Sequence, residues 1–121
     1  LIEAIKVYAE MLNLKLAVNV SGVIQFPSRI EETLFRIAQE ALNNVRKHAG
    51  VAHAEIYISV TATDVLLVVK DEGQGFNIEA HRHIPSIGLQ SIVDRVHAVG
   101  GTADWVSEIG KGTELLIRLP Y

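Results

Sequence analysis

The stretch Val68-Val69-Lys70-Asp71-Glu72-Gly73-Gln74-Gly75-Phe76 decides the fold and points to a ligand site. An apolar run ends in Asp71, and Gly73 and Gly75 follow with one residue between them. An Asp at the end of a strand can accept a hydrogen bond from an exocyclic amine, and the glycines let the backbone turn sharply and approach a ligand. Taken alone, the pattern is equally compatible with a tight turn after a strand.

The neighbouring residues predict the strands of a sheet. Residues 65–69 are apolar on both faces, which is typical of a central strand. Residues 55–60 alternate between apolar and polar types, and 61–64 supply a short hairpin connection to the central strand. The same alternation predicts strands over 14–20, 102–107 and 114–119, with a turn at 110–112 between the last two.

Helical spacing predicts three helices. The longest runs from Ser28 to about Gly50 and carries one apolar stripe. Ser28 is expected to be its N-cap, with Glu31 completing a capping box. The other helices are expected over 1–11 and 88–99, the latter ended by the glycine pair at 100–101.

This order of elements predicts an α+β fold, a two-layer sandwich in which helices cover one face of a mixed sheet of about five strands. Residues 77–86 are polar, rich in His and Arg, and contain a proline, so they are expected to form a mobile loop. A chain of 121 residues is long enough for one domain and too short for two.

The composition excludes several classes of function and kinds of site. A net charge of −3 argues against a nucleic-acid-binding or anionic-membrane surface, and the lack of cysteine excludes disulfides and thiolate metal sites. No apolar run reaches the roughly 18 residues that a transmembrane helix needs. Because the sequence begins at Leu1 without a signal peptide, it is expected to be a domain of a longer protein.

Four polar side chains flank the apolar stripe of the long helix. Glu40, Asn44, Lys47 and His48 follow spacings of i, i+4, i+7 and i+8. An amide oxygen at Asn44 suits Mg²⁺, a carboxylate at Glu40 can orient a metal-bound water, and Lys47 offers a positive charge for a phosphate. The alternative is a solvated helix edge without a ligand.

Other motifs carry weaker signals. Gly88 and Leu89 open a helix whose N-terminal N–H groups can bind an anion, although a simple helix start has the same pattern. The Gly110–Thr113 turn lacks the spacing of a P-loop, and His81 and His83 have no third metal ligand nearby. Trp105 is expected to pack against the core or a neighbouring strand.

Four motifs, in this order along the chain, resemble those of the ATP-binding domain in the family that unites bacterial sensor histidine kinases with gyrase and MutL. The resemblance implies the Bergerat-type fold of that domain. Residues 39–49 resemble the N box, 71–76 the first glycine box, 87–95 a short second glycine box, and 110–113 the last turn. The resemblance covers essentially the whole chain. It is greatest to the nitrate/nitrite-sensor-like subfamily, whose short lid segment this chain shares.

The resemblance implies an adenine side to the site. Asp71 would take the adenine amino group, and Thr113 would help to hold the base. Gly73, Gly75 and Gly88 would border the nucleotide and hinge the lid.

The resemblance also implies a phosphate side. Asn44 would coordinate Mg²⁺ bridging the phosphates, with Glu40 near the metal or its water, so that these two residues are the expected catalytic and metal-binding pair. Lys47 and His48 would approach the phosphates, and Leu89 would lie beside them at the start of the second helix motif.

The implied activity is that of an ATP-dependent protein-histidine kinase in two-component signal transduction. The acceptor histidine of such kinases lies in a separate helical domain and precedes an acidic residue, whereas the five histidines here precede Ala49, Ala54, Arg82, Ile84 and Ala98. We therefore expect a catalytic domain that needs a partner acceptor domain and a downstream response regulator, and that does not autophosphorylate alone. The alternatives are a nucleotide-binding regulatory module and an anti-sigma-type serine kinase.

Location and assembly follow from the same resemblance. The domain is expected to be cytoplasmic, within a bacterial sensor protein that can be membrane-bound, and without nucleic-acid or direct membrane contact of its own. This fragment is expected to be a monomer, because the helices that make the full protein a homodimer lie outside it.

Overall fold

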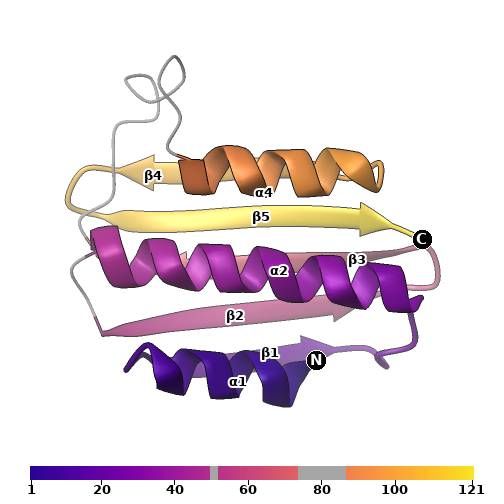
Figure 1. The fold of residues 1–121 in the computed structure, drawn as a ribbon, viewed down its shortest axis with the longest axis horizontal. Helices are drawn as coiled ribbons and strands as arrows, with labels where there is room; N and C mark the ends of the chain where they lie inside the picture. The colour runs from indigo at the N-terminus through magenta and orange to yellow at the C-terminus, as the bar shows by residue number, and fades with distance from the viewer. Residues whose placement is uncertain (50–51, 74–86) are drawn as a thin grey trace.

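In the computed structural model, which describes residues 1–49, 52–73 and 87–121, helices cover one face of a five-stranded sheet (Figure 1). This arrangement confirms the predicted two-layer α+β sandwich. The helices are α1 (Ile2–Met11), α2 (Ser28–Asn44) and α4 (Ile87–Ala98), and a π-helical turn, η1 (Val45–Ala49), continues α2. The strands are β1 (Lys15–Ser21), β2 (His53–Val60), β3 (Asp64–Asp71), β4 (Thr102–Glu108) and β5 (Gly112–Pro120).

The strand order is β1-β2-β3-β5-β4, so β3 is central, as its apolar sequence predicts. β1 and β2 are parallel, and every other pair in this order is antiparallel. A parallel pair needs a crossover connection, and α2 supplies it: this helix follows β1 and precedes β2 in the chain and lies along the strands on one face of the sheet (Figure 1).

The core lies between the helices and one face of the sheet. Strand alternation sends every second residue of β3 into it, namely Val65, Leu67 and Val69, while Leu66 on the opposite face is 38% exposed. The helices contribute the apolar stripes that their spacing predicts. Their buried residues are Ile5, Ala9, Ile30, Leu34, Ile37, Ala38, Ala41, Leu42, Ile92 and Val96.

The start of α2 differs from the expected capping box. Pro27, not Ser28, is the N-cap, and no side chain caps the helix. The Pro27 carbonyl accepts hydrogen bonds from the N–H groups of Ile30 (2.9 Å) and Glu31 (3.1 Å). Because Ser28 is already the first helical residue, it is one position too far along to serve as the cap.

The end of β1 is more exposed than the residues before it. Alternation puts Val20 on the same side of the strand as Leu14, but Val20 is 42% exposed whereas Leu14 is 5% exposed. β1 is an edge strand with a neighbour on one side only, so the side chains near its end are covered less than those of an inner strand.

The end of α4 confirms the predicted glycine cap. Gly100 has a φ of 75°, in the left-handed region, and its N–H donates to the His97 carbonyl at 3.0 Å. The Gly101 N–H donates to the Val96 carbonyl at 2.9 Å. These two bonds form a Schellman motif, which turns the chain from α4 into β4.

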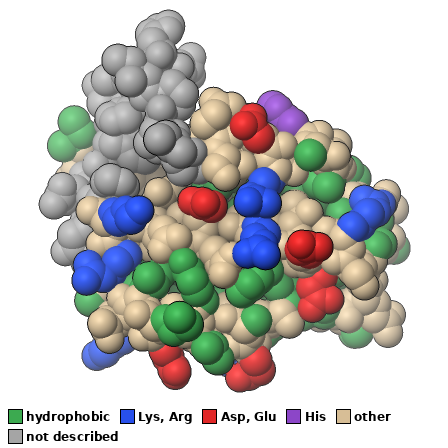
Figure 2. Space-filling model, in the orientation of Figure 1, with side chains coloured by type: hydrophobic (Ala, Val, Ile, Leu, Met, Phe, Trp, Pro, Cys, Tyr) green, Lys and Arg blue, Asp and Glu red, His purple; other side chains and the backbone are tan. Residues whose placement is uncertain are grey.

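The outer surface of the helical layer carries Lys and Arg interspersed with Asp and Glu (Figure 2). Among the described residues that Figure 2 shows, charges of both signs alternate on this face, in keeping with the small net charge of −3. Hydrophobic side chains gather over α1, where Val7 and Met11 are exposed (Figure 2). In the described part of the chain, no helix is both long and apolar enough to span a membrane.

The β2–β3 hairpin is closed by Asp64, at the far end of β3 from Asp71. The Thr61 hydroxyl donates to Asp64 Oδ1 at 2.7 Å, and Arg118 donates to Oδ2 through Nε and Nη2, both at 2.6 Å. The hydrogen bond from Thr61, followed by that from Arg118, lowers the pKa of the Asp64 carboxyl below its ordinary value. The charged form of Asp64 therefore stabilises this hairpin.

We expect Asp64→Asn to lower the melting temperature at neutral pH, because the amide loses the charge that Arg118 pairs with. A lowered folded-state pKa contributes stability that is present above the unfolded pKa and lost as the pH falls through the folded value. The gap between parent and variant should therefore shrink as the pH falls below about 4. Melting curves from pH 2.5 to 7, with the exposed Asp104→Asn as control, measure this. A gap that does not depend on pH would contradict the assignment.

Candidate nucleotide site

The elements that carry the predicted site residues meet at one edge of the molecule. The end of α2 with η1, the end of β3, the start of β5 and the start of α4 all lie at the left in Figure 1. The antiparallel pairing of β3 with β5 produces part of this arrangement, since it places the last residue of one strand beside the start of the other.

Asp71 is the buried polar residue at this edge. It is the last residue of β3, lies on the helix-covered face with Val69 and is 9% exposed. Its Oδ1 accepts a hydrogen bond of 2.9 Å from the N–H of Gly73, so the carboxylate caps the turn that follows the strand. Among the described residues, no hydrogen-bond donor to Oδ2 accompanies this bond.

A polar row extends from Asp71 across three strands. Asp71 lies opposite Thr113 of β5, and Thr113 lies opposite Ser107 of β4. The hydroxyl oxygens of Thr113 and Ser107 are 2.8 Å apart. The strand register thus places Thr113 beside Asp71.

The next row inward is apolar and consists of Val69, Leu115 and Trp105. Trp105 packs against the core, as expected. A polar row that borders an apolar row can hold a flat heteroaromatic ring, because the polar row can hydrogen-bond the edge of the ring and the apolar row can pack against its face.

Ser107 was not among the predicted site residues. Alternation of Ala103, Trp105 and Ser107 along β4, counted through the turn at 110–112, would have placed it opposite Thr113. The sequence signal was therefore present in the register of the hairpin, although Ser107 belongs to no motif.

Gly112 allows β5 to begin against the end of β3. Its φ is 90°, and a Cβ at this position would collide with the carbonyl oxygen of Asp71. Gly110 also has a positive φ, of 84°, but a Cβ there would have no neighbour within 4 Å. The two glycines of the predicted turn thus differ: Gly110 serves the turn, whereas Gly112 lets the two strands approach each other at Asp71.

Glu40 and Asn44 lie one turn apart on α2 and are both half-buried. The helix changes to π-helical geometry after Asn44, so Lys47 is displaced from the α-helical spacing that the sequence predicts. Lys47 is exposed. Nothing is described of the His48 side chain.

The side-chain oxygen atoms of Glu40 and Asn44 are suitable ligands for Mg²⁺. Both offer hard oxygen atoms, and Mg²⁺ usually takes one or two such protein ligands together with water and substrate phosphates. Within the described ranges, no group of three or more His, Cys, Asp or Glu side chains could enclose a metal by itself. These side chains therefore fit a metal that shares its coordination with a phosphate, rather than a fully protein-bound one.

α1 holds the end of α2 in place. The Tyr8 hydroxyl donates to Asn43 Oδ1 at 3.0 Å, and Arg46 Nε donates to the Leu12 carbonyl at 3.1 Å. These bonds attach residues on both sides of Asn44 to the first helix, and so fix the part of α2 that bears the predicted metal ligand.

The remaining predicted residues belong to the segment around 74–86 and the start of α4. Gly88 and Leu89 are the second and third residues of α4, in its first turn. Gly75, the loop predicted over 77–86, and the histidines at 81 and 83 lie outside the described residues.

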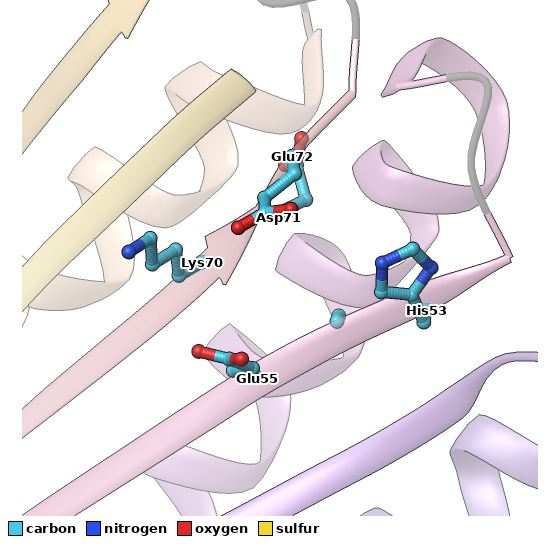
Figure 3. A pocket seen from close by; sticks show the side chains of 6 residues that line it. His53, Glu55, Lys70, Asp71 and Glu72 are labelled. Carbon is cyan, nitrogen blue, oxygen red and sulfur yellow. The ribbon is translucent and has the colours of Figure 1, made fainter. Parts of the chain in front are cut away.

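A small pocket lies on the other face of the same sheet edge (Figure 3). His53, Glu55 and Lys70 line it, and alternation along β2 and β3 places them on the face away from the helices. Glu55 and Lys70 are opposite each other in the strand register. This pocket shares Asp71 with the polar row but is a shallow opening on the open face, and the candidate site remains on the helix-covered side.

Comparison with known proteins agrees with this geometry. The sequence model described as "Histidine kinase-, DNA gyrase B-, and HSP90-like ATPase" matches residues 29–121. The chain therefore belongs to this family of ATP-binding ATPases, within which its curated relatives are sensor histidine kinases.

The chain is 38% identical to the sensor histidine kinase YhcY of Bacillus subtilis over 120 residues, covering 99% of this chain and 32% of that protein. It is 35% identical to LiaS of the same organism over 91 residues, covering 75% and 25%. The chain thus spans about a third or less of these relatives. Among solved structures, full-length ShkA in complex with AMPPNP superposes with a TM-score of 0.77 at 21% identity, over 98% of this chain and 29% of that one, which supports the fold.

We expect Gly112→Ala to destabilise the chain more than Gly110→Ala. Both substitutions place a side chain at positive φ, which costs roughly 1–2 kcal/mol. Gly112→Ala adds the collision with the Asp71 backbone, which is expected to raise its cost by about 1–3 kcal/mol. Urea denaturation of the two variants measures the difference. Equal losses would show that β5 does not need the close approach to Asp71.

Proposed function

We propose that this chain binds Mg·ATP between the end of α2 and the polar row of the sheet, and donates the γ-phosphoryl group to a histidine on a separate domain. The observation that carries the proposal is Asp71, a buried carboxylate at the end of the central strand, whose Oδ1 accepts from Gly73 and whose Oδ2 has no donor among the described residues. Such a group costs free energy unless a donor meets it, and the amino group of adenine is such a donor.

The base side of the site would consist of Asp71 and Thr113, with Val69, Leu115 and Trp105 beneath the ring. Asp71 would accept from the exocyclic amine, and the Thr113 hydroxyl would meet the adjoining edge of the base.

The glycines would border the nucleotide. Gly73 already orients Asp71 through its N–H, and Gly75 would follow it along the same turn. The start of α4, with Gly88 and Leu89, would lie beside the phosphates, because a helix N-terminus favours negative charge.

The phosphate side would use α2 and η1. Asn44 would coordinate Mg²⁺, Glu40 would bind the metal or a water on it, and Lys47 and His48 would approach the phosphate oxygens. When bound, Mg²⁺ would neutralise phosphate charge. The protein's own contribution would be position and electrostatics, which is where most catalysis of phosphoryl transfer lies.

In the transfer itself, a ring nitrogen of the acceptor histidine would attack the γ-phosphorus. The bond from that phosphorus to the bridging oxygen would break, with its electron pair leaving on ADP, and the imidazole would release the single proton carried by its other ring nitrogen. The helical acceptor domain and a response regulator are the proposed partners, and the chain alone is proposed to be a monomeric, single catalytic domain that needs Mg²⁺.

We expect Asp71→Asn to weaken ATP binding at least tenfold, about 1.4 kcal/mol. The amide oxygen can still accept from Gly73, but the amide nitrogen would present donors to the amino group of adenine. Calorimetric titration with Mg·ATP measures the loss, and Asp104→Asn on the open face is the matched control. Unchanged affinity in Asp71→Asn would remove Asp71 from the site.

Phosphoryl transfer is tested by mixing the chain and Mg·[γ-³²P]ATP with a separate helical domain that carries the acceptor histidine. The expected product is an acid-labile label on the added domain and none on the chain itself. An acid-stable label on a serine substrate would instead indicate the serine kinase alternative. Tight nucleotide binding without transfer to either acceptor would indicate the regulatory module.

A further inference from the structure

Tyr8 of α1 makes a hydrogen bond to the end of α2 that none of the sequence motifs predicts. Its ring packs against the core, and its hydroxyl donates to Asn43 Oδ1 at 3.0 Å. A phenylalanine would bury the same ring and would need no partner for a hydroxyl. The hydroxyl therefore serves the contact with Asn43, which directly precedes the proposed metal ligand Asn44.

The last turn of α2 needs support from outside the helix. Asn43 and Asn44 are both poor helix formers, because a short amide side chain competes for backbone hydrogen bonds. The α-helical geometry ends at Asn44, and the π-helical turn η1 follows at once. Such turns are rare and are found frequently at functional sites. Packing against a neighbouring element, rather than helix propensity, must therefore hold this segment.

α1 supplies that support on both sides of Asn44. The Tyr8 hydroxyl holds Asn43, where the α-helical part ends. Arg46, within η1, donates through Nε to the Leu12 carbonyl at 3.1 Å. The Tyr8 bond is partly buried whereas the Arg46 bond is exposed, so the Tyr8 bond competes less with water. Because α2 lies between α1 and α4 (Figure 1), α1 supports it from the side away from α4.

We propose that Tyr8 is a positioning residue for Mg²⁺, whose hydroxyl, acting through Asn43, holds the last turn of α2 so that the Asn44 oxygen meets the metal of Mg·ATP. Tyr8 acts without touching the metal or the nucleotide. Without its hydrogen bond, the turn moves among several arrangements, and the apparent affinity falls with the fraction of molecules that can bind. This inference rests on the proposed function.

The test compares the affinity for ATP in Mg²⁺ with the affinity in EDTA, both by calorimetric titration. The ratio of the two affinities is the gain from Mg²⁺, and it separates the metal from the base. In Tyr8→Phe this gain is expected to fall about fivefold, the factor that one hydrogen bond supplies, while the affinity in EDTA stays the same. In an Asn44→Ala background, Tyr8→Phe should change the gain no further, because the ligand through which it acts is gone.

A second readout needs no nucleotide. The Val45 N–H donates to carbonyls of the preceding turn of α2, and its hydrogen exchange should be faster in Tyr8→Phe than in the parent. Tyr57→Phe is the matched control, because it removes a hydroxyl that donates to Glu55 Oε2 at 2.8 Å on the open face of the sheet. Neither the gain from Mg²⁺ nor the exchange at Val45 should change in this control.

An unchanged gain from Mg²⁺ in Tyr8→Phe would overturn the role of Tyr8 and leave the proposed function intact. Equal losses of affinity in Mg²⁺ and in EDTA, or unchanged exchange at Val45, would do the same. A parent that binds ATP equally well in both conditions would overturn this inference and the metal role of Asn44, but not the base side of the site. A folded parent that binds ATP in neither condition would overturn the proposed function, and this inference with it.

Discussion

The buried carboxylate at the end of the central strand is the constraint on which the rest of the site edge depends. Removing Asp71 from water is costly unless hydrogen bonds replace its hydration. One bond comes from the Gly73 N–H, which ties the orientation of the carboxylate to the turn after β3. The strands beside it must also come close, and Gly112 permits this where any other residue would collide with the Asp71 backbone.

The arrangement around Asp71 divides the edge into parts with different chemistry. The row of Asp71, Thr113 and Ser107 is polar, and the row beneath it is apolar. Across from them, α2 ends in oxygen donors and a cation, held to α1 by Tyr8 and Arg46. A nucleotide has the same division into an apolar ring with a polar edge and a charged phosphate chain, which is why its binding explains this edge better than a structural role for each residue alone.

Periodicity predicted the elements well because it reports which face of a strand or helix is buried, and burial dominates the fold. The central position of β3, the three helices and the glycine cap after α4 all followed from it. Predictions of finer features were wrong where the backbone geometry decided the outcome. Ser28 has the right chemistry for a cap, but Pro27 takes that position. The π-helical turn after Asn44 has no sequence signature that could be read from one chain.

The sequence predicted the candidate site in part, as it did the fold. Asp71 and Thr113 were expected to cooperate, and the register puts them opposite each other. Ser107 was missed because its place in the polar row arises from pairing between strands, not from a motif.

The fit between Asp71 and an amine is tested most directly by a crystal structure of the chain with Mg²⁺ and a non-hydrolysable ATP analogue. The account predicts the adenine amino nitrogen at about 3 Å from Asp71 Oδ2, on the helix-covered side of the sheet. A base bound elsewhere, with Asp71 bonded only to Gly73 and water, would contradict it.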